Sequence, residues 1–452
     1  MRSQILYSVC LLLSVVMWIP AAHGQENAAK RGRKALETRA FTSAGWSLRA
    51  YDTVWKYWDN VPKTKPDNYQ QAFLDYYGLH PAPFENGKLP MGLRVGQGLF
   101  GKGISTDCMI CHGGSIMGKS YIGLPNTTSD IQALVSDMGR ATGTGGKTPF
   151  AFSNVRGTTE AAAFAVFLSS MRKPDLTIQL SRQNWDLCDD LCEDPPAWWL
   201  LKKKKTMYMT GSNDSRSVRS IMQFMLGSLN GPKKFHQEEA TFRDIQAFLK
   251  NLEAPKYPFA IDKKMVHKGK LLFEKKCSTC HGTYGNDWTY PNKIIPLDVI
   301  GTDPKRANGL PREWGEWYNK SWFAKEKRPD GGIGFPAKSP AGYQAPPLDG
   351  IWATAPYLHN ASVPTLYHVL NSSARPTLFT RSFKTDESAY DKKNVGWKIT
   401  NADAGELQKM SAYEQRKIYD TRQPGRRNVG HTFGDAFTEE ERRAVIEYLK
   451  TL

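Results

Sequence analysis

Two short segments of the chain combine cysteine and histidine at the spacing that attaches haem. They are Cys108-Met-Ile-Cys-His112 and Cys277-Ser-Thr-Cys-His281. In a Cys-x-x-Cys-His segment the two thiols add to the vinyl groups of a haem, and the adjacent imidazole gives its iron an axial nitrogen. One such match is weak, because zinc ribbons and redox pairs also use Cys-x-x-Cys. Two matches predict two covalently bound haem c groups, with these attachment residues: Cys108, Cys111, His112, Cys277, Cys280 and His281.

The ligand on the far side of each iron decides what that iron can do. An iron with two protein ligands transfers electrons, whereas an open face can bind peroxide or dioxygen. Outside the two motifs and the first 24 residues, six histidines remain: His80, His236, His267, His359, His368 and His431. His431 precedes the last predicted helix, so we expect it to bind the second iron together with His281. Met410, His368 and His359 are the alternatives.

The first haem has no obvious second ligand in the sequence. Its candidates are Met117, Met138, Met171, Met207, Met209, Met222 and Met225. Methionine often fills irregular core gaps, so we expect most of them in the core. An iron held only by His112, with an open face, is the favoured interpretation. Trp198 and Trp199 follow a Pro-Pro pair and either pack in the core or form an aromatic step between redox centres. With His359, they are the candidate catalytic residues.

An internal repeat indicates how the chain is organised. Gly96-Gln-Gly-Leu-Phe100 precedes the first motif and Gly269-Lys-Leu-Leu-Phe273 the second, each read as an amphipathic helix. Residues 238–252 and 438–452 also match, with acidic first turns and apolar residues at helical spacing. This predicts a mainly α fold of two cytochrome c-type modules with long irregular loops and insertions. The expected division is a signal peptide (1–24), an N-terminal arm (25–90) and two modules (91–255 and 256–452).

The beginning of the chain predicts export. Arg2 and an apolar run to Ile19 are followed by Ala22-His-Gly24, which is typical of a signal peptide cleaved after Gly24. An uncleaved membrane anchor is the alternative, and no later stretch is long enough to span a membrane. We therefore expect a periplasmic protein without a transmembrane segment. In that compartment Cys188 and Cys192 are expected to form a disulfide, with a metal or redox role as the alternative.

The formal net charge of +17 suggests what the protein meets. A basic surface favours an acidic redox partner protein or an anionic membrane face. Nucleic acid is the least suitable partner for an exported haem protein, and we expect none. A second copy of the chain, giving a homodimer, is another candidate.

One segment resembles a known family. Pro346 to Leu366, which contains Trp-Ala-Thr-Ala-Pro-Tyr-Leu-His359, resembles the signature after the second haem in the bacterial di-haem cytochrome c peroxidase and MauG superfamily. With Pro-Pro-x-Trp-Trp upstream, it looks most like the branch containing the rubber oxygenase. The resemblance implies a low-spin haem in one module that serves a reactive haem in the other. Those peroxidases place Met or Tyr about fourteen residues after the signature histidine, where this chain has Ser373. This departure favours His431 as the ligand.

Three functional hypotheses follow. The leading one is a periplasmic di-haem redox protein in which one haem reacts with peroxide or dioxygen. The second is a pure electron carrier with two six-coordinate haems. The third is a docking subunit of a larger redox complex that uses its basic surface.

Overall fold

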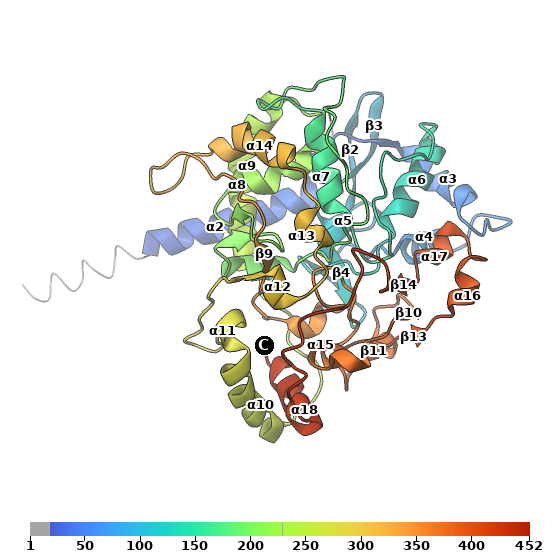
Figure 1. Cartoon of the computed structure of the whole chain (residues 1–452). Helices are drawn as coiled ribbons and strands as arrows, with labels where there is room; N and C mark the ends of the chain where they lie inside the picture. Colours follow the sequence, from blue (N-terminus) through green and yellow to red (C-terminus); the bar gives the residue numbers. More distant parts are fainter. Residues whose placement is uncertain (1–18, 228) are drawn as a thin grey trace, which may run out of the picture.

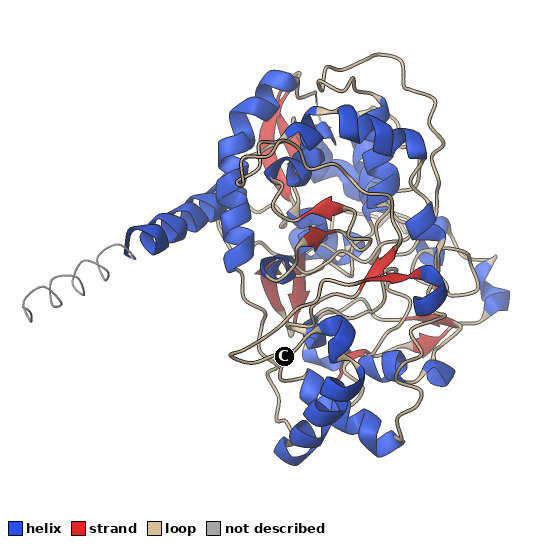
Figure 2. Ribbon diagram, turned by 60° about the vertical axis from the view of Figure 1, so that its left-hand side comes forward, coloured by secondary structure: helices blue, strands red, loops and turns tan. Residues whose placement is uncertain are grey.

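A computed structural model describes residues 19–452 except residue 228 (Figure 1). Its described part contains 17 α-helices and is 38% helix and 13% strand. The prediction of a mainly α fold is therefore only partly right, because short strands and long loops join the helices (Figure 2). Most of the predicted signal peptide, residues 1–18, lies outside the described residues. Among the described helices, none is both long and apolar enough to cross a membrane.

The first described helix, α2 (Ile19–Thr38), packs along α9 (Pro232–Asn251). The two backbones meet at Gly32, where a Cβ would lie only 2.0 Å from the carbonyl oxygen of Asp244. Only glycine allows this approach. One turn later, Leu36 is buried against the same helix pair. Pro232 starts α9 at a position where the missing N–H costs nothing.

A second helix pair has the same construction. α10 (Lys263–Lys276) packs along α18 (Glu439–Leu449), and a Cβ at Gly269 would lie 1.9 Å from the carbonyl oxygen of Ala444. Phe273, one turn later, is buried. α18 begins with a capping box in which Thr438 and Glu441 bond each other's backbone N–H.

The two pairs are equivalent in register, and this corrects part of the predicted repeat. Aligning residues 238–252 with 438–452 places Asp244 on Ala444, so Gly32 corresponds to Gly269. Both terminal segments are helices, as predicted. The helix that plays the part of α10 in the first half is therefore α2, not residues 96–100.

Residues 96–100 belong to a β-hairpin, so the predicted helix there is wrong. β2 (Leu93–Gly98) and β3 (Gly101–Thr106) pair from Leu93↔Thr106 to Gly98↔Gly101. Leu99 and Phe100 form the two-residue tip and are 75% and 103% exposed. Glycines at 96, 98, 101 and 103 disfavour a helix and allow the turn, where Gly101 has φ +104°.

Buried Arg94 on β2 connects the end of α2 to the first Cys-x-x-Cys-His segment. Its guanidinium donates to the carbonyl oxygens of Leu36 and Glu37 at 2.6 and 2.5 Å, which completes the C-terminus of the helix. It also pairs with Asp107 at 3.1 Å, and Asp107 accepts from the N–H of Met109. In the second half, α10 runs directly into Cys277.

The other described helices are short (Figure 1), and in the sequence they lie between α2 and α9 or between α10 and α18. They are α3 (Leu48–Thr53), α4 (Tyr69–Tyr77), α5 (Met109–His112), α6 (Ile131–Thr142), α7 (Ala161–Ser170), α8 (Val218–Ile221), α11 (Ser278–His281), α12 (Leu297–Ile300), α13 (Lys305–Asn308), α14 (Arg312–Lys320), α15 (Leu366–Leu370), α16 (Ala404–Leu407) and α17 (Ala412–Gln415).

The described strands form small antiparallel sheets. Two sheets have three strands, in the orders β1-β3-β2 and β13-β10-β14, and the others are pairs. The bounds are β1 (Trp46–Ser47), β4 (Gly113–Ile116), β5 (Lys119–Ile122), β6 (Thr206–Met207), β7 (Asn213–Asp214), β8 (Ile294–Pro296), β9 (Gly342–Gln344), β10 (Leu378–Thr380), β11 (Tyr390–Asp391), β12 (Gly396–Trp397), β13 (Thr400–Asn401) and β14 (Tyr419–Asp420).

The apolar core is rich in aromatic side chains and crosses the middle of the sequence. One cluster under the second motif contains Phe273, Trp352 and Tyr448, and Trp199 joins it from the first half. A second cluster packs α3 and α4 on α6 around Trp58. Residues of the predicted N-terminal arm thus contribute to the core of the first half.

Candidate functional site

A cavity of about 360 Å³ lies beside the second Cys-x-x-Cys-His segment. Cys277, Cys280 and His281 form one wall, carried by the end of α10 and by α11. The other walls come from α15, α18 and connecting loops and are mainly apolar: Leu200, Phe273, Ile295, Ile300, Leu348, Ile351, Leu358, Leu366, Val369, Leu370, Phe433, Val445 and Leu449. Such an enclosure suits a flat, largely apolar cofactor.

His281 and His431 face this cavity together. Nδ1 of His281 bonds the carbonyl oxygen of Pro346 at 2.8 Å, and this bond leaves Nε2 for another partner. The ring centroids of the two histidines lie 6.2 Å apart. This separation leaves room for one metal ion with a bond of about 2 Å to a nitrogen of each ring.

The turn that carries His431 is strained and held from two sides. His431 has φ +47°, which is uncommon for a side chain of this size, and its N–H bonds the carbonyl oxygen of Ile300 at 2.7 Å. The half-buried guanidinium of Arg375 donates to the carbonyl oxygens of Asn428, Gly430 and His431 at 2.6, 2.7 and 3.2 Å. No sequence pattern predicted this role for Arg375.

Burial keeps these imidazoles neutral, which is the form that binds a metal. It lowers the pKa of His431 to about 4, with further lowering by His281 and Arg375, and it also lowers the pKa of His281. Nδ1 of His431 is buried without a hydrogen-bond partner. The apolar walls, the paired thiols and the facing neutral imidazoles fit a haem attached to Cys277 and Cys280.

Of the three alternative ligands predicted for the second iron, His359 alone lines this cavity. Its ring stacks on Tyr343 with centroids 3.8 Å apart, and its buried Nε2 has no partner. Burial lowers the pKa of His359 to about 3. His368 bonds Thr365 instead, and neither His368 nor Met410 lines the cavity.

The first Cys-x-x-Cys-His segment has the same local arrangement. Cys108 caps α5, and Nδ1 of His112 bonds the carbonyl oxygen of Pro196 at 3.0 Å. The ring of His112 stacks on Trp198, with centroids 5.0 Å apart, and burial lowers the pKa of this histidine to about 4. This arrangement suits a second haem attached to Cys108 and Cys111.

The two carbonyl oxygens that orient the histidines were missed by the sequence reasoning. Each belongs to a Pro-Pro pair, Pro195-Pro196 in the first half and Pro346-Pro347 in the second. A tryptophan follows each pair within a few residues. This pattern, repeated in the two halves, is the sequence signal for both acceptors.

The segment that orients His112 also forms a wall of the cavity beside the second motif. Pro195, Pro196 and Ala197 line that cavity, and the next residue is the Trp198 that stacks on His112. Trp199 is buried and donates from Nε1 to the carbonyl oxygen of Asp349 at 2.8 Å. The same short segment therefore contacts His112 of the first motif and lines the cavity beside the second motif.

The methionines proposed for the first haem lie in different parts of the molecule. Met222 and Met225 belong to the apolar cluster around α9, and Met209 lines the cavity beside the second motif. Met138 lies in the cluster that contains Ile110 of the first motif. Cys188 and Cys192 are free cysteines, so the expected disulfide is not present. Cys192 is buried and its thiol contacts Thr158 Oγ1 at 3.2 Å.

Comparisons with known proteins bear on the second half. Residues 342–380 match a protein-family model described as RoxA-like, cytochrome c-like. The match supports a c-type cytochrome. A cytochrome c domain carries covalently bound haem c and has a redox function, and the matched segment contains His359 and Pro346.

Two curated relatives come from Sinorhizobium fredii (strain NBRC 101917 / NGR234). The uncharacterized protein y4iM is 32% identical over 291 residues, covering 57% of this chain and 64% of that protein. The uncharacterized protein y4iJ is 30% identical over 262 residues, covering 44% of this chain and 41% of that protein. The chain thus spans less than two thirds of the length of either relative.

Proposed function

We propose that the chain is an exported di-haem c-type cytochrome of the di-haem peroxidase and MauG superfamily that transfers electrons in the periplasm. His281 and His431 would hold a haem attached to Cys277 and Cys280 and would keep its iron low-spin. His112 would hold a haem attached to Cys108 and Cys111, which would supply reactivity toward peroxide or dioxygen. The facing pair of His281 and His431 is the observation that carries this proposal.

Each haem iron, when bound, supplies reversible one-electron chemistry. The protein's part is to orient and to exclude water. The carbonyl oxygens of Pro346 and Pro196 fix the tautomer and the plane of the two motif histidines. Arg375 fixes the turn of His431. The apolar walls of the cavity beside the second motif would keep water away from a haem bound there.

Replacing His431 tests the ligand assignment. His431→Ala should convert one of two haems from low-spin to high-spin, because it removes the imidazole whose ring lies 6.2 Å from that of His281. Electron paramagnetic resonance and absorption spectra of the purified protein measure this change. His368→Ala is the matched control, since that histidine is half-buried outside the cavity and should leave the spectra unchanged. An unchanged spectrum for His431→Ala rejects the assignment.

The number of haems and their reactivity are tested separately. A haem assay should give two haems per chain, and one after replacement of either cysteine pair by alanine. A reactive first haem predicts a high-spin ferric signal that shifts with peroxide, and carbon monoxide binding after reduction. If both haems of the intact protein are low-spin and inert, the chain is the pure electron carrier.

A further inference from the structure

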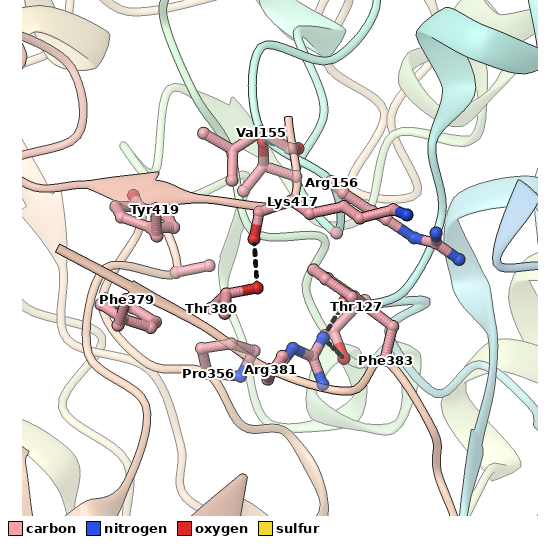
Figure 3. Close-up of a pocket in the computed structure, with 13 residues that line it drawn as sticks. Thr127, Val155, Arg156, Pro356, Phe379, Thr380, Arg381, Phe383, Lys417 and Tyr419 are labelled. Atoms are coloured by element: carbon pink, nitrogen blue, oxygen red, sulfur yellow. Dashed lines mark hydrogen bonds between the residues drawn. The ribbon is translucent and has the colours of Figure 1, made fainter. Parts of the chain in front are cut away.

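A separate and much smaller cavity lies where residues of the two halves meet. It has a volume of about 20 Å³ and shares no lining residue with the cavity of His281. Thr127 and Arg156 line it from the first half, and Arg381, Phe383 and Lys417 line it from the second (Figure 3). A volume of this size holds a group about as large as one water molecule.

The guanidinium of Arg381, which lines this cavity, is not fully hydrogen-bonded. Its guanidinium is buried, and one nitrogen, Nη2, donates to the carbonyl oxygen of Thr127. The other nitrogen, Nη1, is buried and has no hydrogen-bond partner. The planar group lies between Phe383 and Trp397, at 4.8 and 4.9 Å from the ring centroids, which fixes its orientation. A buried guanidinium nitrogen without an acceptor is energetically costly.

A second guanidinium makes the surroundings more positive. Arg156 contacts the Phe383 ring at 4.7 Å, so this one ring is in contact with two guanidinium groups. All its hydrogen bonds go to neutral groups: the carbonyl oxygens of Thr128 and Asp75 and the hydroxyl of Tyr413.

No carboxylate neutralises these two charges directly. Among the described residues, none lies within 4.0 Å of either guanidinium, whereas Lys417 beside them is paired with Glu414. Burial and Arg156 lower the pKa of Arg381 to about 9, and Asp194 opposes this shift only from a distance. Burial also raises the pKa of Asp194, which favours its neutral form. The site thus holds more positive than negative charge.

We propose that this cavity binds one small anionic group, which accepts a hydrogen bond from Nη1 of Arg381 and lies at the contact between the two halves. The cavity volume restricts this group to a halide ion or one oxygen of a carboxylate. The source is either a halide from solution or a propionate of a bound haem. The halide case is independent of the proposed function, whereas the propionate case depends on it.

Bromide tests the solution source on the intact holoprotein. Thermal unfolding is measured in sodium bromide and in sodium gluconate, whose anion is too large, at equal ionic strength. Because an ion that binds only the folded state raises its stability, the midpoint should rise with bromide and then level off. Anomalous scattering from bromide in crystals should place one ion beside Arg381. Arg381→Met should lose both effects. Arg422→Met, which removes an exposed arginine paired with Asp420, should keep them.

The propionate source predicts a different pattern. Bromide then has no specific effect on unfolding, and Arg381→Met shifts a propionate band in the resonance Raman spectrum of the haems. If Arg381→Met does not fold, Arg381→Lys replaces it, because lysine keeps the charge but not the fixed fork of donors. The proposal is overturned if bromide neither binds nor stabilises and the propionate bands are the same in wild type and variant.

Discussion

At the scale of single residues, the firmest site feature is the orientation of the histidines. Each Cys-x-x-Cys-His histidine donates from Nδ1 to a proline carbonyl, and this leaves Nε2 to bind. The motif predicted the histidines, whereas their backbone acceptors lie 84 and 65 residues away and are marked in the sequence only by a Pro-Pro pair ahead of a tryptophan. His431 was predicted from its position before the last helix, and the structure places its ring opposite His281.

Arg375 should act as a positioning residue for His431. Because its guanidinium holds three carbonyl oxygens of that strained turn, Arg375→Met should let the turn relax and weaken the proposed bond between His431 and iron. We expect a mixture of low-spin and high-spin signals, and a smaller change than in His431→Ala. Spectra at increasing temperature measure the mixture. Arg422→Met is the control, and a fully low-spin Arg375→Met protein contradicts the role.

His80 should make stability depend on pH. It is buried against Asn126 and Thr128, and burial, with Arg156 and Arg381 nearby, lowers its pKa from 6.5 to about 4. The unfolded chain then binds more protons between these values, so stability falls as pH drops from 6.5 toward 4. The loss is on the order of 3 kcal/mol. Urea unfolding of wild type and His80→Gln at several pH values measures the contribution of His80. If the unfolding free energies of the two proteins change with pH in the same way, His80 is not responsible.

At the scale of elements, the repeat was predicted correctly at its ends and wrongly at its beginning. The terminal helices 238–252 and 438–452 carry a full helical pattern and were found. Gly96-x-x-Leu-Phe100 imitated Gly269-x-x-Leu-Phe273 in letters, but its glycines build a hairpin. The true counterpart, Gly32 on α2, lies 76 residues before Cys108, and only its contact with Asp244 reveals it.

Three alanine substitutions test this equivalence. Phe273→Ala and Leu36→Ala remove side chains that are 1% and 2% exposed and should cost about 3–5 and 2–5 kcal/mol of unfolding free energy. Phe100→Ala removes a fully exposed side chain and should change stability by less than about 0.5 kcal/mol. Urea unfolding of the holoproteins gives these values. A large loss of unfolding free energy for Phe100→Ala would contradict the exposed hairpin and favour a packed helix at residues 96–100.

At the scale of the whole molecule, largely buried ion pairs join the two halves. Arg416 pairs with Asp130 at 2.9 Å, and Lys203 pairs with Asp349 at 2.8 Å. Arg306 and Glu193 form a third pair. Each would leave an uncompensated buried charge if the halves separated. Such contacts could not be predicted from the sequence, because charged residues give no periodic signal. These ion pairs explain why the cavity beside the second motif has a wall from the first half.

The charge of the whole chain should control its reaction with redox partners. Lys and Arg exceed Asp and Glu by 61 to 44, and Lys204 and Lys276 lie at the cavity of the second motif. A positive surface attracts anions and repels cations, and salt screens both effects over a length of about 8 Å at physiological ionic strength. The sign of the salt effect therefore reports the charge beside the site of electron transfer.

Two small reagents of opposite charge make this measurable. In stopped-flow experiments, the rate constant with ferrocyanide should fall as salt rises, and that with hexaammineruthenium(II) should rise. Lys204→Gln combined with Lys276→Gln should reduce both slopes, because these lysines line the cavity wall. Lys409→Gln, an exposed residue outside that wall, should leave them unchanged. If both reagents show the opposite trends, the surface beside the site of electron transfer is acidic and the partner protein is basic.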